Sequence, residues 1–174
     1  MSELRLVNPT EAYAKQIWDY RAEFLNRSDD LAGCAGLKEV ANVAEWLANL
    51  KKNSCEETVT EGLVPATTYL AIRNADRQIV GMIDIRHRLN DFLLKSGGHI
   101  GYSVHPAERR KGYAKEMVRL ALIKCREELA LSKVLITCDK ANIASAKTIQ
   151  ANGGILENEI PENDRMTQRY WVAV

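Results

Sequence analysis

The sequence predicts a mixed α/β fold in which a central β-sheet is flanked by helices, in the order β-αα-βββ-α-β-α-ββ. Short runs of alternating or β-branched apolar residues indicate the strands, and longer segments with an apolar residue every three or four positions indicate the helices. The strand–helix–strand unit at residues 100–138 must cross over right-handed, which places its two strands parallel. The 174 residues are expected to form a single domain, residues 1–174, with enough chain for a sizeable core.

The first part of the chain predicts one strand and two helices. Residues 4–7 alternate apolar positions and form the strand. A helix follows, because Asn8 can cap it, Pro9 suits the first helical position and Glu11 stands three residues after the cap. The apolar faces of this helix and of the next one comprise Tyr13, Ile17, Tyr20 and Phe24, then Val40, Val43, Leu47 and Leu50.

Three strands in succession are predicted next. Residues 67–73 and 78–86 flank a polar turn and form the first two. In the second of these, Asp84 shares a face with apolar residues, which is unusual for an exposed charge. The third strand begins at His99, and Pro106 stops it because proline has no N–H for a sheet ladder.

The remaining chain predicts a helix, a strand, a second helix and a closing hairpin. The long helix starts at Ala114, and a compact β-branched run at residues 133–138 is typical of a buried strand. Asn142 can cap the next helix, and the glycine pair after that helix is a usual C-terminal signal. Residues 155–160 and 167–172 predict the two strands of the hairpin.

Composition and charge exclude several classes of protein. A formal net charge of +1 argues against a general nucleic-acid binder, which usually shows a strong basic excess. The apolar runs are too short to span a membrane, and the first residues lack a basic-then-apolar signal pattern, so a cytoplasmic protein is expected. The four cysteines show neither a C-x-x-C pair nor metal-type spacing, so no metal site is expected.

The junction between the third predicted sheet strand and the long helix carries the clearest functional signal. Arg109, Arg110 and Lys111 precede Gly112 at the point where the helix begins. The first turn of a helix leaves backbone N–H groups unpaired and has a positive potential, and glycine lets the backbone approach a ligand closely. The pattern predicts a phosphate or pyrophosphate site, with a basic surface turn that only starts a helix as the alternative.

The segment Arg109-x-x-Gly112-x-Ala114 resembles the (Gln/Arg)-x-x-Gly-x-(Gly/Ala) signature of the GNAT superfamily of acyl-CoA-dependent N-acetyltransferases. The resemblance extends from about residue 67 to the C-terminus and covers the strand before the loop and the helix after it. It implies that acetyl-CoA is the co-substrate and that its pyrophosphate is held by the loop residues Arg109, Arg110, Lys111, Gly112, Tyr113 and Ala114. It also implies that the pantetheine lies beside the backbone of Tyr102, Ser103 and Val104, where the Val104 N–H could stabilise an oxyanion.

A second stretch of the same resemblance begins at Asn142. The segment Asn142-x-x-Ser145 is similar to the family's second cofactor-binding stretch, although Asn142 could act only as a helix cap. The chain departs from the family at Ile149, where many members carry the tyrosine that reprotonates the thiolate. Ser145, Tyr102 and Tyr113 are alternative acids, or the thiolate leaves as an anion, as a thiol with a pKa of about 8.5 can do.

Two residues are candidates for the general base that takes the proton of the attacking amine. His99 stands at the start of the pantetheine strand, where relatives often have a carboxylate, and an imidazole titrates near neutrality. Asp84 is the rival on the neighbouring strand. The alternative for each is structural: a hydrogen-bonded histidine at a strand end, and an aspartate paired with Arg86 or Arg88.

The resemblance therefore implies an N-acetyltransferase that moves acetyl from acetyl-CoA to a primary amine by direct attack. The acceptor is a small-molecule amine or a protein amine, selected by residues 26–65, and a homodimer is possible because relatives often pair. A non-catalytic acyl-CoA-binding or sensor domain is the second hypothesis, suggested by the departure at Ile149. A different nucleotide-phosphate enzyme ranks last, because the chain lacks G-x-G-x-x-G and G-x-x-x-x-G-K-[ST].

Overall fold

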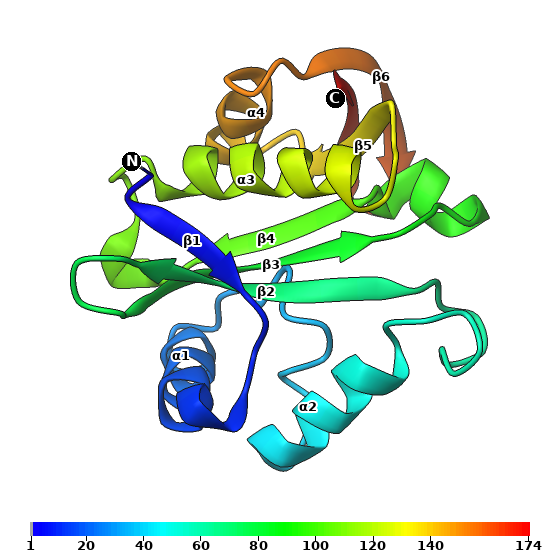
Figure 1. Ribbon diagram of the computed structural model, residues 1–174. Helices are drawn as coiled ribbons and strands as arrows, with labels where there is room; N and C mark the ends of the chain where they lie inside the picture. Colours follow the sequence, from blue (N-terminus) through cyan, green and yellow to red (C-terminus); the bar gives the residue numbers. More distant parts are fainter. Residues whose placement is uncertain (1) are drawn as a thin grey trace.

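The computed structural model describes residues 2–174 and confirms the predicted α/β fold (Figure 1). A four-stranded antiparallel sheet contains, in spatial order, β1 (Leu4–Val7), β2 (Ala66–Arg73), β3 (Ile79–Arg86) and β4 (Ile100–Val104). A three-stranded antiparallel sheet contains, in spatial order, β5 (Lys133–Asp139), β7 (Arg165–Ala173) and β6 (Ile155–Glu162). The predicted central sheet is thus divided into two.

The helices cover both faces of the four-stranded sheet. Within residues 2–174 the α-helices are α1 (Ala14–Asn26), α2 (Val43–Lys52), α3 (Tyr113–Glu127) and α4 (Ile143–Gln150). In Figure 1, α1 and α2 lie on one face of that sheet and α3 lies on the other, with α4 beside the second sheet. Because both faces are covered, β3 is buried along nearly its whole length. In the part of the chain that the structure describes, every helix is too short or too polar to span a bilayer.

The main departure from the predicted topology lies between β4 and β5. The sequence predicts that these strands run parallel in one sheet, but they belong to different sheets, and no parallel ladder forms among residues 2–174. They meet at one end, where the His99 N–H donates to the Leu135 carbonyl at 2.7 Å. The Nδ1 of the His99 ring accepts a hydrogen bond from the Leu135 N–H at 2.9 Å. The Leu135 N–H is thus bonded to a side chain and not to a backbone carbonyl of β4, and no ladder continues between β4 and β5.

The first helix begins later than predicted. Thr10 is extended (φ −140°, ψ 167°) and a 3₁₀ turn at Glu11–Tyr13 precedes α1, so Asn8 does not cap this helix. The expected apolar face is confirmed, since Ile17, Tyr20 and Phe24 are all buried. In α2 the buried residues are Val43 and Trp46, of which only Val43 belongs to the predicted apolar face.

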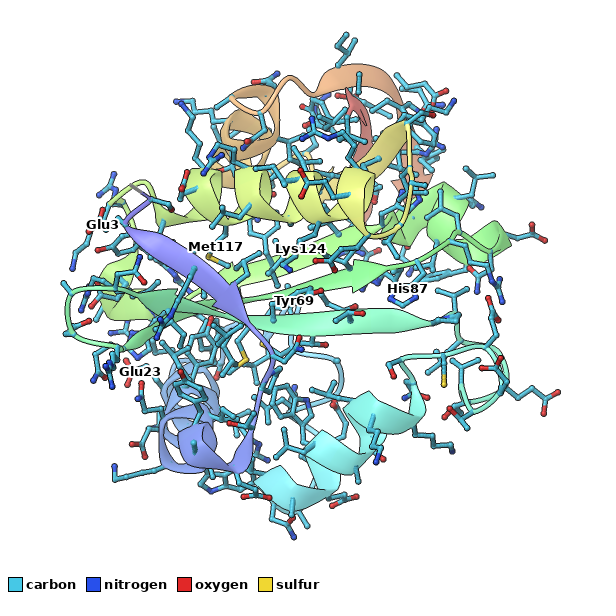
Figure 2. The ribbon with its side chains drawn as sticks, in the orientation of Figure 1. Glu3, Glu23, Tyr69, His87, Met117 and Lys124 are labelled. Carbon is cyan, nitrogen blue, oxygen red and sulfur yellow. The ribbon has the colours of Figure 1, made fainter. Side chains whose placement is uncertain are left out.

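The core has one part on each side of the four-stranded sheet. On the α3 side, Met117 packs directly on Gly81: a Cβ built on Gly81 would lie 2.5 Å from the Met117 sulfur (Figure 2). On the other side, the segment between α1 and α2 presses against β4, since a Cβ on Gly33 would lie 2.4 Å from the Gly101 carbonyl oxygen. Both glycines therefore allow an element to approach the sheet more closely than any side chain would permit.

Candidate functional site

The loop between β4 and α3 carries a continuous row of free backbone N–H groups. Gly112 is the N-cap of α3, and both it (φ +85°) and Arg110 (φ +65°) are left-handed. Among residues 2–174, no acceptor lies within hydrogen-bond reach of the N–H groups of residues 110–115. Unpaired amides at the N-terminus of a 15-residue helix, with left-handed residues between them, form an anion-binding concavity.

The space in front of this loop is open at Gly112. A Cβ built on Gly112 would meet no heavy atom within 4 Å, so the missing side chain serves no packing contact within the protein. Its positive φ explains why glycine suits the backbone here, and its bare surface leaves the adjoining amides accessible. The left-handed backbone, the unpaired N–H groups and the open space at Gly112 therefore make this loop suitable for a pyrophosphate group.

The three cations of the loop have different partners. Arg109 is turned toward the end of α1, where its guanidinium pairs with Asp29 at 2.9 Å and its Nε donates to the Val104 carbonyl at 3.2 Å. Lys111 pairs with Glu108 at 2.8 Å. Arg110 is exposed and forms no ion pair within the described residues, so it is the loop cation that is free to meet a phosphate. The partner Asp29 was missed by sequence reasoning, because it lies 80 positions away from Arg109.

The Tyr113 side chain has a structural role. Its ring is buried, and its hydroxyl accepts a hydrogen bond from Arg73 at 3.3 Å and donates to Glu3 at 3.1 Å. The side chain therefore joins α3 to the edge of the four-stranded sheet. Only the backbone of Tyr113 remains available to a ligand of the loop.

The predicted pantetheine strand, β4, has one free backbone edge. The His105 N–H donates to the Val80 carbonyl and the His99 carbonyl accepts from the Arg86 N–H, so these two groups point toward β3. Because polar groups alternate in direction along an antiparallel strand, the N–H groups of Tyr102 and Val104 point away from β3. A ligand lying along this edge could use them as an added strand would.

The side chains of β4 divide between its two faces. Ser103 is buried on the α1 side, where its hydroxyl lies 3.0 Å from the Tyr20 hydroxyl and 3.5 Å from the Cys34 sulfur. Tyr102 lies on the other face, and its hydroxyl is 2.7 Å from the Ser145 Oγ of α4. The Ser103 side chain thus anchors the strand, while Tyr102 bridges the separation between β4 and α4.

The helix α4 begins as predicted. The Asn142 Oδ1 accepts the Ser145 N–H at 3.1 Å, which confirms the cap. Ile149 is fully buried, and a Cβ on Gly154 would lie 2.5 Å from its Cγ2. Position 149 therefore belongs to the core, and in the first turn of α4 it is Ser145 that contacts β4, through the Tyr102 hydroxyl.

The contacts of His99 favour a structural role. The ring is buried and its Nδ1 accepts the Leu135 N–H. Burial, followed by the nearby Arg86 guanidinium, lowers the pKa of His99 from 6.5 to about 4. The neutral ring therefore carries its proton on Nε2, and neither nitrogen offers a free lone pair for proton abstraction.

We expect His99 to make stability fall on acidification. Below pH 6.5 the unfolded chain binds a proton on this histidine that the folded chain, with a pKa of about 4, does not bind. The free energy of unfolding should therefore fall by about 3 kcal/mol between pH 6.5 and 4, with no further loss from this group at lower pH. A His99→Gln variant keeps an acceptor for the Leu135 N–H and lacks the titration. Urea unfolding at several pH values tests this, and equal pH slopes in both proteins would contradict it.

Asp84 is buried beneath the segment between α1 and α2. It accepts a hydrogen bond from the Thr68 hydroxyl at 2.8 Å and pairs with Arg86 at 3.3 Å, as the structural alternative expected. Burial raises the pKa of Asp84, against the opposing effects of Arg86 and Thr68. It stands opposite Gly101 of β4, where Gly33 makes its close approach. Asp84 is thus a carboxylate with raised basicity beside the predicted pantetheine strand.

Comparison with known proteins finds a family model that matches most of the chain. The sequence matches the family model of the acetyltransferase (GNAT) domain over residues 3–155. No curated protein matches the chain.

The fold is similar to solved acetyltransferase structures. A ribosomal-protein-alanine acetyltransferase from Vibrio fischeri has 16% identity and a TM-score of 0.72, with 99% of this chain and 94% of that chain covered. A ribosomal α-N-protein acetyltransferase in complex with coenzyme A has 14% identity and a TM-score of 0.73, with 100% and 96% covered. A chimeric spermidine N-acetyltransferase built in part from Vibrio cholerae has 13% identity and a TM-score of 0.68, with 99% and 96% covered. At these identities the comparison shows the fold alone.

Proposed function

Because the chain belongs to the GNAT acetyltransferase domain family, we propose that it is an N-acetyltransferase that moves the acetyl group of acetyl-CoA to a primary amine by direct attack. The observation that carries the proposal is the row of unpaired amides at residues 110–115, with the free cation Arg110 beside it. This combination supports binding of the pyrophosphate of the co-substrate.

The residues around the loop support the rest of the co-substrate site. The free N–H groups of Tyr102 and Val104 would hold the pantetheine arm, and the Val104 N–H would stabilise negative charge on the carbonyl oxygen. Asn142 and Ser145 would border the arm from α4. Acetyl-CoA would supply an acetyl group activated as a thioester.

Of the two candidate bases, the contacts favour Asp84. A carboxylate with a raised pKa accepts a proton more readily than an ordinary one, and this one lies beside β4. His99 has no free lone pair and a lowered pKa. In the proposed reaction Asp84 takes the proton of the attacking ammonium, directly or through a water molecule.

The proposed acceptor is a primary amine, on a small molecule or on a protein. The similar structures include ribosomal-protein and spermidine acetyltransferases, which makes both kinds of amine reasonable first substrates. The segment at residues 26–65, which contains α2 and presses on β4 at Gly33, would shape the acceptor side.

Calorimetric titration with acetyl-CoA, coenzyme A and ATP tests the proposal, followed by a thiol-release assay against spermidine, other amines and peptides with free N-termini. We expect saturable binding of acetyl-CoA and coenzyme A, weak or no binding of ATP, and thiol release with at least one amine. Binding without turnover across the amines would favour the non-catalytic acyl-CoA-binding domain. Absence of coenzyme A binding would overturn both hypotheses.

A further inference from the structure

The Arg86 side chain lies beside the candidate base and is held in one position. Arg86 is the last residue of β3, next to His87, which is labelled in Figure 2. Its Nε lies 3.3 Å from the Asp84 carboxylate, and its Nη1 donates to the carbonyls of Gly97 and Gly98 at 3.2 and 3.4 Å. Contacts on two sides thus fix the plane of the guanidinium, so its remaining nitrogen has a defined place.

That remaining nitrogen, Nη2, is an accessible donor without a partner. Within residues 2–174 it bonds no acceptor, and no partly buried side chain there has an enclosed nitrogen that lacks a partner, so Nη2 is open to solvent. It lies over β4, since a Cβ built on Gly101 would be 3.4 Å from it. Gly101 is the strand residue opposite Asp84. A free cationic N–H₂ group therefore lies over the predicted pantetheine strand, beside the candidate base.

Asp84 also keeps capacity for a further hydrogen bond. An ionised carboxylate has about four acceptor positions. The described residues supply the Thr68 hydroxyl and the Arg86 guanidinium as its side-chain partners. The Arg86 side chain is 26% exposed and that of Asp84 is 7% exposed, so the guanidinium is the more accessible of the two. The pair therefore offers a cation to a carboxylate and an anion to an ammonium group.

Such a pair is complementary to an α-amino acid. The ammonium and the carboxylate of an α-amino acid are joined through one carbon, and the opposite charges of Asp84 and Arg86 are likewise adjacent, at 3.3 Å. A guanidinium binds a carboxylate through charge-assisted hydrogen bonds. A polyamine would bring only further cations toward Arg86, and a peptide N-terminus would bring a neutral amide, so neither pairs with the guanidinium charge.

We propose that Arg86 selects the acceptor by binding its carboxylate, so that the acetylated amine belongs to an α-amino acid. This inference rests on the proposed function and narrows its acceptor. With the carboxylate on Nη2, the ammonium lies toward Asp84, which takes its proton in the proposed reaction. Arg86 then binds the substrate and also holds the carboxylate of Asp84.

The first test compares acceptors in the wild-type protein. Thiol release from acetyl-CoA is measured with the common α-amino acids, their carboxamides, spermidine and peptides with free N-termini. We expect at least one amino acid to exceed its own carboxamide at least about tenfold in kcat/KM, both counted as free amine, because the carboxamide loses a charge-assisted hydrogen bond. Spermidine and the peptides should be poorer substrates than that amino acid.

The second test uses Arg86→Gln, with Arg88→Gln as the matched control. Both variants remove one positive charge, but the Arg88 side chain is 50% exposed and pairs with Glu56. In Arg86→Gln the preference for the amino acid over its carboxamide should fall at least about tenfold, through a higher KM for the amino acid, and Arg88→Gln should keep it. Arg86→Lys retains the charge without the planar fork, so it should keep part of the preference.

The outcomes separate a binding role from a structural one. If Arg86→Gln slows the amino acid and its carboxamide by the same factor, Arg86 only supports Asp84 and this inference is wrong, while the proposed function stands. The same holds if spermidine or a peptide is the better substrate of the wild-type protein. Should Arg86→Gln fail to fold, the wild-type comparison decides alone. If the wild-type protein does not bind coenzyme A, or releases thiol with no amine, both proposals fail together.

Discussion

A Gly112→Val variant is expected to lose at least about tenfold in affinity for coenzyme A, the largest effect on binding that a single loop residue should produce. The left-handed backbone at Gly112 aligns the free amides of residues 110–115, and valine strongly disfavours that conformation. Its side chain would also occupy the open space in front of the loop. Calorimetric titration with coenzyme A measures the loss.

Gly62 provides a matched control for this variant. It has nearly the same backbone conformation as Gly112, with φ +84° against +85°, and a Cβ at either position would meet nothing within 4 Å. Gly62 lies in the connection between α2 and β2, away from the loop. Valine at either position should lower the free energy of unfolding by a similar amount, about 1–2 kcal/mol. Equal affinities for coenzyme A in the two variants would show that the loop assignment is wrong.

Replacement of Asp84 by asparagine should lower kcat by about 10²- to 10⁴-fold, the usual contribution of a general base. Asparagine has nearly the same shape as aspartate and can still accept a hydrogen bond from the Thr68 hydroxyl. It cannot take up a proton from the amine. In the wild-type enzyme the rate should fall on acidification as Asp84 becomes protonated. Since burial raises the pKa of Asp84, that fall should begin at a higher pH than for an ordinary aspartate.

His99→Gln is the control variant for Asp84→Asn, because it tests the other candidate base. Glutamine can keep the hydrogen bond from Leu135, so kcat should change little if His99 only joins β4 to β5. The thermal unfolding of Asp84→Asn should also stay close to that of the wild-type protein. If His99→Gln abolishes turnover while Asp84→Asn remains active, the base is His99 and our assignment is reversed.

Features that depend on neighbouring residues were predictable from the sequence. The strands β2 and β3 were located within a residue or two, because their apolar patterns and polar turn are local. Asn142 caps α4 through the N–H three residues later, a contact within one turn. The start of α3 was also located within a residue, because a glycine followed by a helical apolar pattern is a local signal.

Features that join distant segments required the tertiary structure. The division of the sheet depends on His99 meeting Leu135, and sequence patterning cannot show which residue takes a ladder position in a neighbouring strand. Arg109 pairs with Asp29, which lies 80 positions away, and the Tyr102 hydroxyl of β4 lies 2.7 Å from the Ser145 Oγ of α4. These contacts arise when elements far apart in the chain pack together, so side-chain roles at this site follow from the fold and not from local sequence.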